Sequence, residues 1–89
     1  MRISTGNAAR TMPSIKHNGF SLIIRTNDHD PPHVHVVKGD GELVFILGDG
    51  EPYLERELSR MKKGDERHAL EAVKAHRKVL LDLWRRIHE

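Results

Sequence analysis

Three histidines, two aspartates and two prolines lie within residues 28–36, in the order Asp-His-Asp-Pro-Pro-His-Val-His-Val. Proline fixes its own φ and disfavours the helical region for the residue before it, so Asp30-Pro31-Pro32 must run extended. The segment that follows, 33–37, has the composition of a β-strand. Because side chains alternate along a strand, His33 and His35 should point to one face. Two neighbouring imidazoles can share a metal ion, bind an anion when protonated, or act as acid and base.

The same pair also has a purely structural interpretation, as part of a polar row opposite a buried valine row. A metal site would need at least a third ligand, and Asp28, His29 and Asp30 are the nearest candidates. The C-terminal part of the chain offers His76 as another. No metal or other cofactor is predicted; if a metal binds, the expected ligands come from His33, His35, Asp28 and His76.

The composition excludes several classes of function. The chain has no cysteine, which rules out disulfides, thiolate zinc sites and thiol nucleophiles. It contains no long apolar run, and its first residues lack the apolar core of a signal peptide. We therefore expect a cytoplasmic protein with no membrane segment. Aromatic residues are scarce, so the core should be aliphatic.

The first two thirds of the chain show strand patterns separated by turn signals. Strands are expected around Ile15 and over Phe20–Thr26, His33–Val37 and Glu42–Leu47, with a charged edge strand over Tyr53–Leu58. The turns are His17-Asn18-Gly19, Gly39-Asp40-Gly41 and the break at 48–52.

After Gly64 the hydrophobic period changes to about 3.6 residues, which predicts one helix over Glu66–His88 with Asp65 as its N-cap. Its apolar face should pack on the sheet. That face comprises Leu70, Val73, Leu80, Trp84 and Ile87, with Ala69, His76 and Leu83 beside them. The predicted fold class is α+β: a small antiparallel β-sheet of about four strands packed against one long C-terminal α-helix.

Residues 1–11 are polar and unpatterned, so we predict a flexible N-terminal extension followed by a single α+β domain over 12–89. A domain of this size is near the lower limit for a self-sufficient core, which makes a homodimer or a complex with another protein reasonable.

Positive charge is concentrated near the C-terminus. The chain carries a net charge of +2, and most of its 15 basic residues lie after residue 54. Such a region can bind phosphates, although a mixed-charge helix face is often simply solvated. The candidate nucleic-acid-binding residues are Arg25, Lys38, Arg77 and Lys78.

The segment 31–36 (Pro-Pro-His-Val-His-Val), the Gly39-Asp40 turn and the Trp84-containing C-terminal helix resemble a family of small prokaryotic proteins, the domain-of-unknown-function family numbered 4160. The resemblance covers about residues 12–88. It implies a compact cytoplasmic α+β protein with a small protein partner encoded nearby, the two forming a toxin–antitoxin system. His29 can be another residue in this family, so we discount it as a ligand.

Three interpretations remain open. A toxin-type component could cut RNA without a metal, with His33 and His35 as catalytic acid and base and with arginine or lysine holding the phosphate. A non-catalytic module could bind a protein or nucleic acid through Tyr53 to Lys63 or through the exposed helix face. A metal protein could use His33, His35 and either Asp28 or His76.

Overall fold

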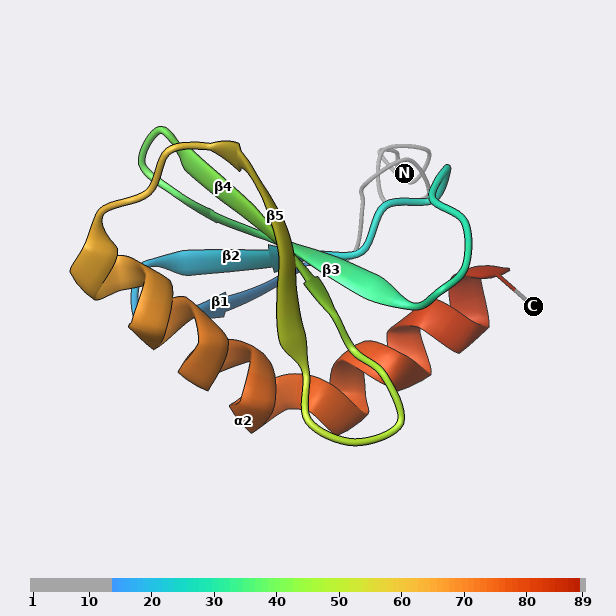
Figure 1. Cartoon of the computed structure of the whole chain (residues 1–89). Helices are drawn as coiled ribbons and strands as arrows, with labels where there is room; N and C mark the ends of the chain where they lie inside the picture. The colour runs from blue at the N-terminus through green and yellow to red at the C-terminus, as the bar shows by residue number, and fades with distance from the viewer. Residues whose placement is uncertain (1–13, 89) are drawn as a thin grey trace, which may run out of the picture.

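The computed structural model describes residues 14–88, which form five β-strands and one α-helix (Figure 1). The elements are β1 (Ser14–His17), β2 (Phe20–Ile23), β3 (His33–Lys38), β4 (Gly41–Ile46), β5 (Tyr53–Ser59) and α2 (Lys63–His88). All five strands form one antiparallel sheet in the order β1-β2-β3-β4-β5. The predicted α+β class is confirmed, with five strands rather than about four. The predicted N-terminal extension and the domain start at residue 12 lie outside the described residues.

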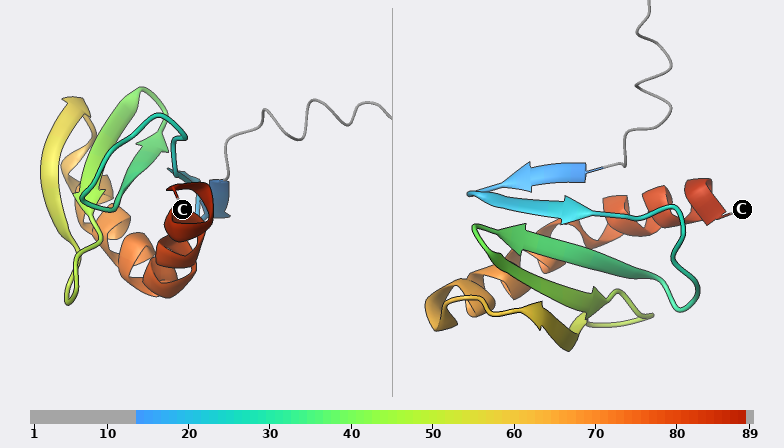
Figure 2. Two further views of the ribbon diagram at one scale, coloured as in Figure 1. Left: turned by 90° about the vertical axis from the view of Figure 1, so that its right-hand side faces the viewer. Right: turned by 90° about the horizontal axis from the view of Figure 1, so that it is seen from above.

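Helix α2 runs across one face of the sheet, as the views in Figure 1 and Figure 2 show. Val34 and Val36 of β3 are fully buried among the residues that this helix covers. Because strand side chains alternate, His33 and His35 start from the opposite face of β3. The core is mainly aliphatic, as expected; it comprises Phe20, Leu22, Ile24, Val34, Val36, Leu43, Phe45, Leu47, Met61, Ala69, Ala72, Val73, Leu80 and Trp84.

Two tight turns set the register of the strands around the histidines. Asn18 and Gly19 both have positive φ, at 49° and 86°, which is the conformation of a two-residue hairpin turn between β1 and β2. Gly39 opens the second turn with a φ of 57°. That turn aligns β3 with β4 so that Lys38 lies opposite Gly41. Both turns were predicted from the sequence.

Strand β2 is shorter than the predicted Phe20–Thr26. Its pairing with β3 ends where Ile23 faces His35, and the chain then leaves the sheet as a connector over residues 24–32. Figures 1 and 2 both place this connector beside the C-terminal end of α2. The Asp30–Pro31 peptide bond within it is cis. The connector rejoins the sheet where the amide of Leu47 donates to the Pro32 carbonyl oxygen at 3.0 Å.

The helix begins at Lys63, three residues before the predicted start, so Asp65 is not its N-cap. The amides of Asp65 and Glu66 already donate to the Lys62 carbonyl oxygen, at 2.9 and 3.0 Å. Asp65 instead lies in the first turn, where a carboxylate is favoured by the partial positive charge of the helix N-terminus. Among residues 14–88, no helix combines the length and the apolar character that crossing a bilayer requires.

Candidate functional site

The carboxylate of Asp28 joins the two histidines of β3. Its Oδ2 atom lies 2.9 Å from His33 Nε2 and 3.0 Å from His35 Nε2. The two imidazole rings are adjacent, with centroids 5.5 Å apart. The sequence predicted that these rings share a side of β3, and the connector brings Asp28 back over them.

The other ring nitrogen of each histidine also has an oxygen partner. His33 Nδ1 lies 2.8 Å from the Pro31 carbonyl oxygen, and His35 Nδ1 lies 2.9 Å from Glu42 Oε2. The same Glu42 oxygen accepts a hydrogen bond from Arg25 Nη2 at 2.8 Å. Asp28, the histidines, Glu42 and Arg25 therefore form one continuous polar chain across strands β3 and β4 and the connector.

The four imidazole nitrogens of this cluster face oxygen atoms that, when the carboxylates are ionised, can only accept hydrogen bonds. Two neutral imidazoles carry two N–H groups, one on each ring. The four contacts therefore require two further protons, or a cation that takes their place between the Nε2 atoms and Asp28. This requirement is the main chemical property of the cluster.

The cluster is largely shielded from water. His35 is 6% exposed, and the side chains of His33 and Asp28 are partly buried. The indole of Trp84 packs against the His33 ring with centroids 5.1 Å apart, and it stacks on His88 at 3.8 Å on the same helix. Polar groups buried in this way need partners, because a buried donor or acceptor without one is costly.

This geometry bears on the ribonuclease interpretation. An acid–base pair must bring ring nitrogens within hydrogen-bond reach of the substrate. His35 is buried, and both of its ring nitrogens contact carboxylates. His33 is the more exposed of the two, but its nitrogens are also engaged. Catalysis by the two rings stays a prediction, and it would require the Asp28 contacts to open.

The predicted phosphate-binding residues do not converge. Arg25 reaches the cluster through Glu42. At the other end of β3, Lys38 pairs with Asp65 at 3.1 Å. On the helix, Arg77 donates to backbone carbonyl oxygens, and Lys78 is exposed.

His76, one of the conditional metal ligands, is not part of the histidine cluster. Its Nε2 lies 3.0 Å from Nδ1 of His17 on β1. The helix crosses the sheet at an angle, so the residue that reaches His33 is Trp84, two turns further along α2.

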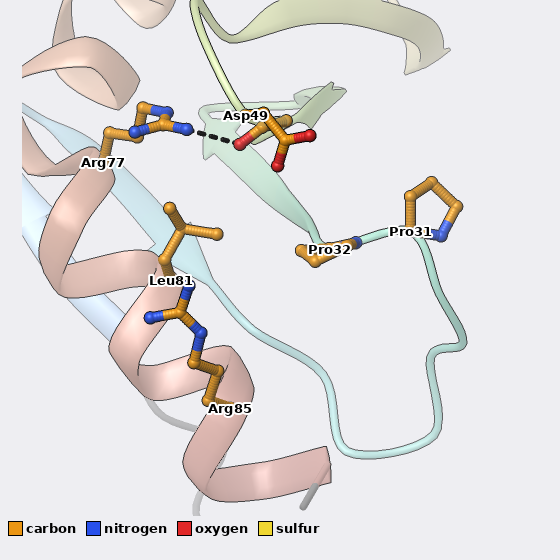
Figure 3. A pocket seen from close by; sticks show the side chains of 7 residues that line it. Pro31, Pro32, Asp49, Arg77, Leu81 and Arg85 are labelled. Carbon is orange, nitrogen blue, oxygen red and sulfur yellow. Dashed lines mark hydrogen bonds between the residues drawn. The ribbon is translucent and has the colours of Figure 1, made fainter.

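A separate pocket of about 470 Å³ lies between the diproline, the β4–β5 loop and α2 (Figure 3). Arg77 lines it and is held there by hydrogen bonds from Nε to the Leu47 carbonyl oxygen, at 3.0 Å, and from Nη2 to the Gly48 carbonyl oxygen. Asp49 and Arg85 line the same pocket. The Arg77 guanidinium is already hydrogen-bonded to the backbone, and the Asp49 carboxylate in the same pocket would repel a phosphate. The pocket therefore offers no clear phosphate site.

Sequence reasoning did not identify Glu42 or Trp84 as parts of the cluster. A signal for Glu42 was available: the turn pairs Val37 with Glu42, and His35 is two residues from Val37 on the same face. Such diagonal neighbours are within reach of long side chains. No comparable signal existed for Trp84, because its contact depends on the crossing angle of the helix.

The outer edge of the sheet, strand β5, is a second distinctive feature. All seven residues of β5 are exposed. Of the four exposed large hydrophobic side chains in residues 14–88, three belong to this strand: Tyr53, Leu54 and Leu58. The pairing with β4 skips Glu55 and Leu58, which form bulges. Exposed apolar side chains gathered on one strand are typical of a protein-binding surface.

The fold and the two features define a small α+β domain with a His-carboxylate cluster and an exposed edge strand that carries both apolar and charged side chains. The chain matches the family model described as Domain of unknown function (DUF4160) over residues 19–85, and it belongs to this family. No curated protein and no solved structure matches the chain significantly.

Proposed function

We propose that this chain is the protein-binding half of a toxin–antitoxin pair and that it holds its small protein partner on residues 53–63. The observation that carries the proposal is the concentration of exposed apolar side chains on β5. Tyr53, Leu54 and Leu58 are 57%, 45% and 49% exposed. The resemblance to a family whose members are encoded beside a second small protein supports the choice of partner.

An edge strand offers both backbone and side-chain contacts to a partner. Within residues 14–88, no strand pairs with the outer side of β5, so this side of the sheet is where a partner could add a strand. The apolar side chains would supply the contact area from which most interface energy comes. The segment ends in Lys62 and Lys63, which are exposed and can pair with acidic groups of the partner.

The charge pattern of β5 disfavours a second copy of this chain as the occupant. Antiparallel self-pairing centred on Arg56 would place this residue opposite its own copy and Glu55 opposite Glu57. A register centred on either glutamate would put two glutamates together. Like charges directly opposite each other destabilise a strand pair. A different protein, with basic residues opposite Glu55 and Glu57, suits the edge better.

We do not propose RNA as the ligand, because Arg25, Lys38 and Arg77 are each engaged in contacts within the protein. Of the four candidate residues, Lys78 alone is exposed, and a single lysine is a weak phosphate site. If the chain nevertheless binds RNA, the affinity should fall steeply with added salt.

The test uses the full chain and the protein encoded by the neighbouring gene, with binding measured by titration calorimetry. A Leu54→Ser/Leu58→Ser double variant should weaken binding by about tenfold or more, since both leucines would lie in the interface. Val79→Ser is the matched control, because Val79 is 50% exposed on the outer face of α2. Unchanged affinity of the β5 variant, with its circular dichroism spectrum preserved, would refute the proposal. So would an equal loss in both variants.

A further inference from the structure

We infer that Asp28, His33 and His35 form a binding site for one divalent transition-metal ion of the Zn²⁺ class. This site is independent of the β5 surface, since none of its residues lies on that strand. The inference rests on two observations: the convergence of the ligand atoms and the contacts that orient both imidazoles.

The three ligand atoms converge on a common point. One ligand atom from each of Asp28, His33 and His35 lies within 4.8 Å of the other two. The two nitrogen–oxygen separations are 2.9 and 3.0 Å. Two ligands that are each about 2.1 Å from a metal, at an angle of about 90–110°, lie about 3.0–3.4 Å apart. The two nitrogen–oxygen separations are therefore close to those of ligands that share one metal ion.

Both imidazoles are already held in the orientation that a metal requires. The Pro31 carbonyl oxygen can only accept a hydrogen bond, so His33 must carry its proton on Nδ1. The Glu42 carboxylate favours the same tautomer for His35. In each neutral ring this leaves the Nε2 lone pair directed at Asp28. Metal-bound histidines almost always donate their other N–H to a carbonyl or carboxylate in this way.

The types of donor at the centre of the cluster also suit a divalent ion. With Nδ1 as the hydrogen-bond donor of each ring, both Nε2 lone pairs face the same anionic Asp28 oxygen, and a cation between them would contact all three. On the far side of His35, Arg25 balances the charge of Glu42 at 2.8 Å.

The type of metal follows from the donors. Two imidazole nitrogens and one carboxylate oxygen favour zinc, iron, nickel or copper over magnesium and calcium, which prefer oxygen ligands. Three protein ligands are fewer than the four of a closed structural zinc site. The remaining coordination position would be available to water or to another ligand, as in catalytic centres.

The single tryptophan makes the site directly measurable. Trp84 packs against the His33 ring at 5.1 Å, and the chain contains no other tryptophan. The experiment uses the full, untagged chain after treatment with a chelator and its removal by dialysis. Titration with Co²⁺ should quench the Trp84 fluorescence and produce visible absorption bands, both saturating at one ion per chain. Competition with Zn²⁺ should reverse both signals.

Variants separate this site from weak binding by other histidines. Asp28→Ala and His33→Gln should each lower the Co²⁺ affinity by about tenfold or more, because each removes a ligand. His17→Gln and His76→Gln change the other histidine pair and should leave the affinity unchanged. Glu42→Gln is a third type of variant. It keeps all three ligands but weakens the hydrogen bond that orients His35, so it should lower the Co²⁺ affinity by less than the loss of a ligand does.

The site variants are compared only if their circular dichroism spectra match that of the native chain. Asp28→Ala replaces a partly exposed side chain in a connector, so it should disturb the fold least. The absence of saturable Co²⁺ and Zn²⁺ binding to the native chain at micromolar concentrations would overturn the inference. Equal affinity of the native chain and Asp28→Ala would also overturn it, since the bound ion would then lie elsewhere.

Discussion

The imidazole of His33 packs against the indole of Trp84, with ring centroids 5.1 Å apart, and this contact joins the start of β3 to the last turns of α2. Trp84 is itself 3% exposed and belongs to the hydrophobic core. One side chain therefore supports both the packing of the helix and one wall of the histidine cluster. The stability of the fold and the geometry of the cluster should consequently depend on the same residue.

Replacing Trp84 by alanine should destabilise the chain strongly. Truncation of a large buried aromatic residue typically costs about 3–5 kcal/mol, through lost burial and the cavity that remains. The measurement is urea unfolding followed by circular dichroism at the helix minimum. Val79→Ala, at an exposed position five residues earlier on α2, should change the free energy of unfolding by no more than about 0.5 kcal/mol. Comparable effects of the two substitutions would contradict the burial of Trp84.

Replacing His35 by alanine should also destabilise the chain, for a different reason. Asp28 would keep His33 as a partner and Glu42 would keep Arg25, but each would lose its contact with His35. A hydrogen bond to a charged group contributes about 1.5–3 kcal/mol. His68→Ala is the control, because His68 is exposed on α2. Unfolding is measured with a chelator present, so that bound metal does not contribute. An effect of His35→Ala no larger than that of His68→Ala would show that the polar chain contributes little to stability.

The contact between Arg25 and Glu42 should make a small contribution. The two side chains form an ion pair at 2.8 Å, but that of Arg25 is 38% exposed, so water screens the charges. A double-mutant cycle with Arg25→Met and Glu42→Gln should give a coupling energy of about 0.2–1 kcal/mol, decreasing with added salt. A coupling of several kcal/mol, insensitive to salt, would indicate a buried pair instead.

Local sequence signals predicted most of the strands and turns. Alternation placed Val34 and Val36 in the core, and the Asn18-Gly19 and Gly39 turns set the hairpins because few residues other than glycine and asparagine adopt positive φ readily. The placement of His33 and His35 on the same face of β3 followed from the same alternation. These features depend on residues that are neighbours in the chain or across one turn, which is why a single sequence contains them.

The parts that sequence could not predict depend on three-dimensional arrangement. His76 and Trp84 both have helical spacing consistent with the buried face, and only the angle at which α2 crosses the sheet decides that His76 meets His17 while Trp84 meets His33. The choice of Asp28 among residues 28–30 depends on the path of the connector. The early start of the helix at Lys63 was missed because Gly64 is unfavourable inside a helix.

Gly41 and Gly64 provide a final, paired prediction about the backbone. A Cβ atom on Gly41 would lie 2.8 Å from the Met61 Cα and 2.9 Å from the Arg60 carbonyl oxygen, so the segment between β5 and α2 would have to move. Gly41→Ala should therefore destabilise the chain by about 1–3 kcal/mol, as overpacking generally does.

A Cβ on Gly64 meets nothing within 4 Å, and Gly64 lies in the first turn of α2. Gly64→Ala should stabilise the chain by up to about 1 kcal/mol, since alanine favours the helix and restricts the unfolded state. Denaturant unfolding of both variants measures the difference, and a stabilising Gly41→Ala would mean that β4 does not approach Met61 as closely as described.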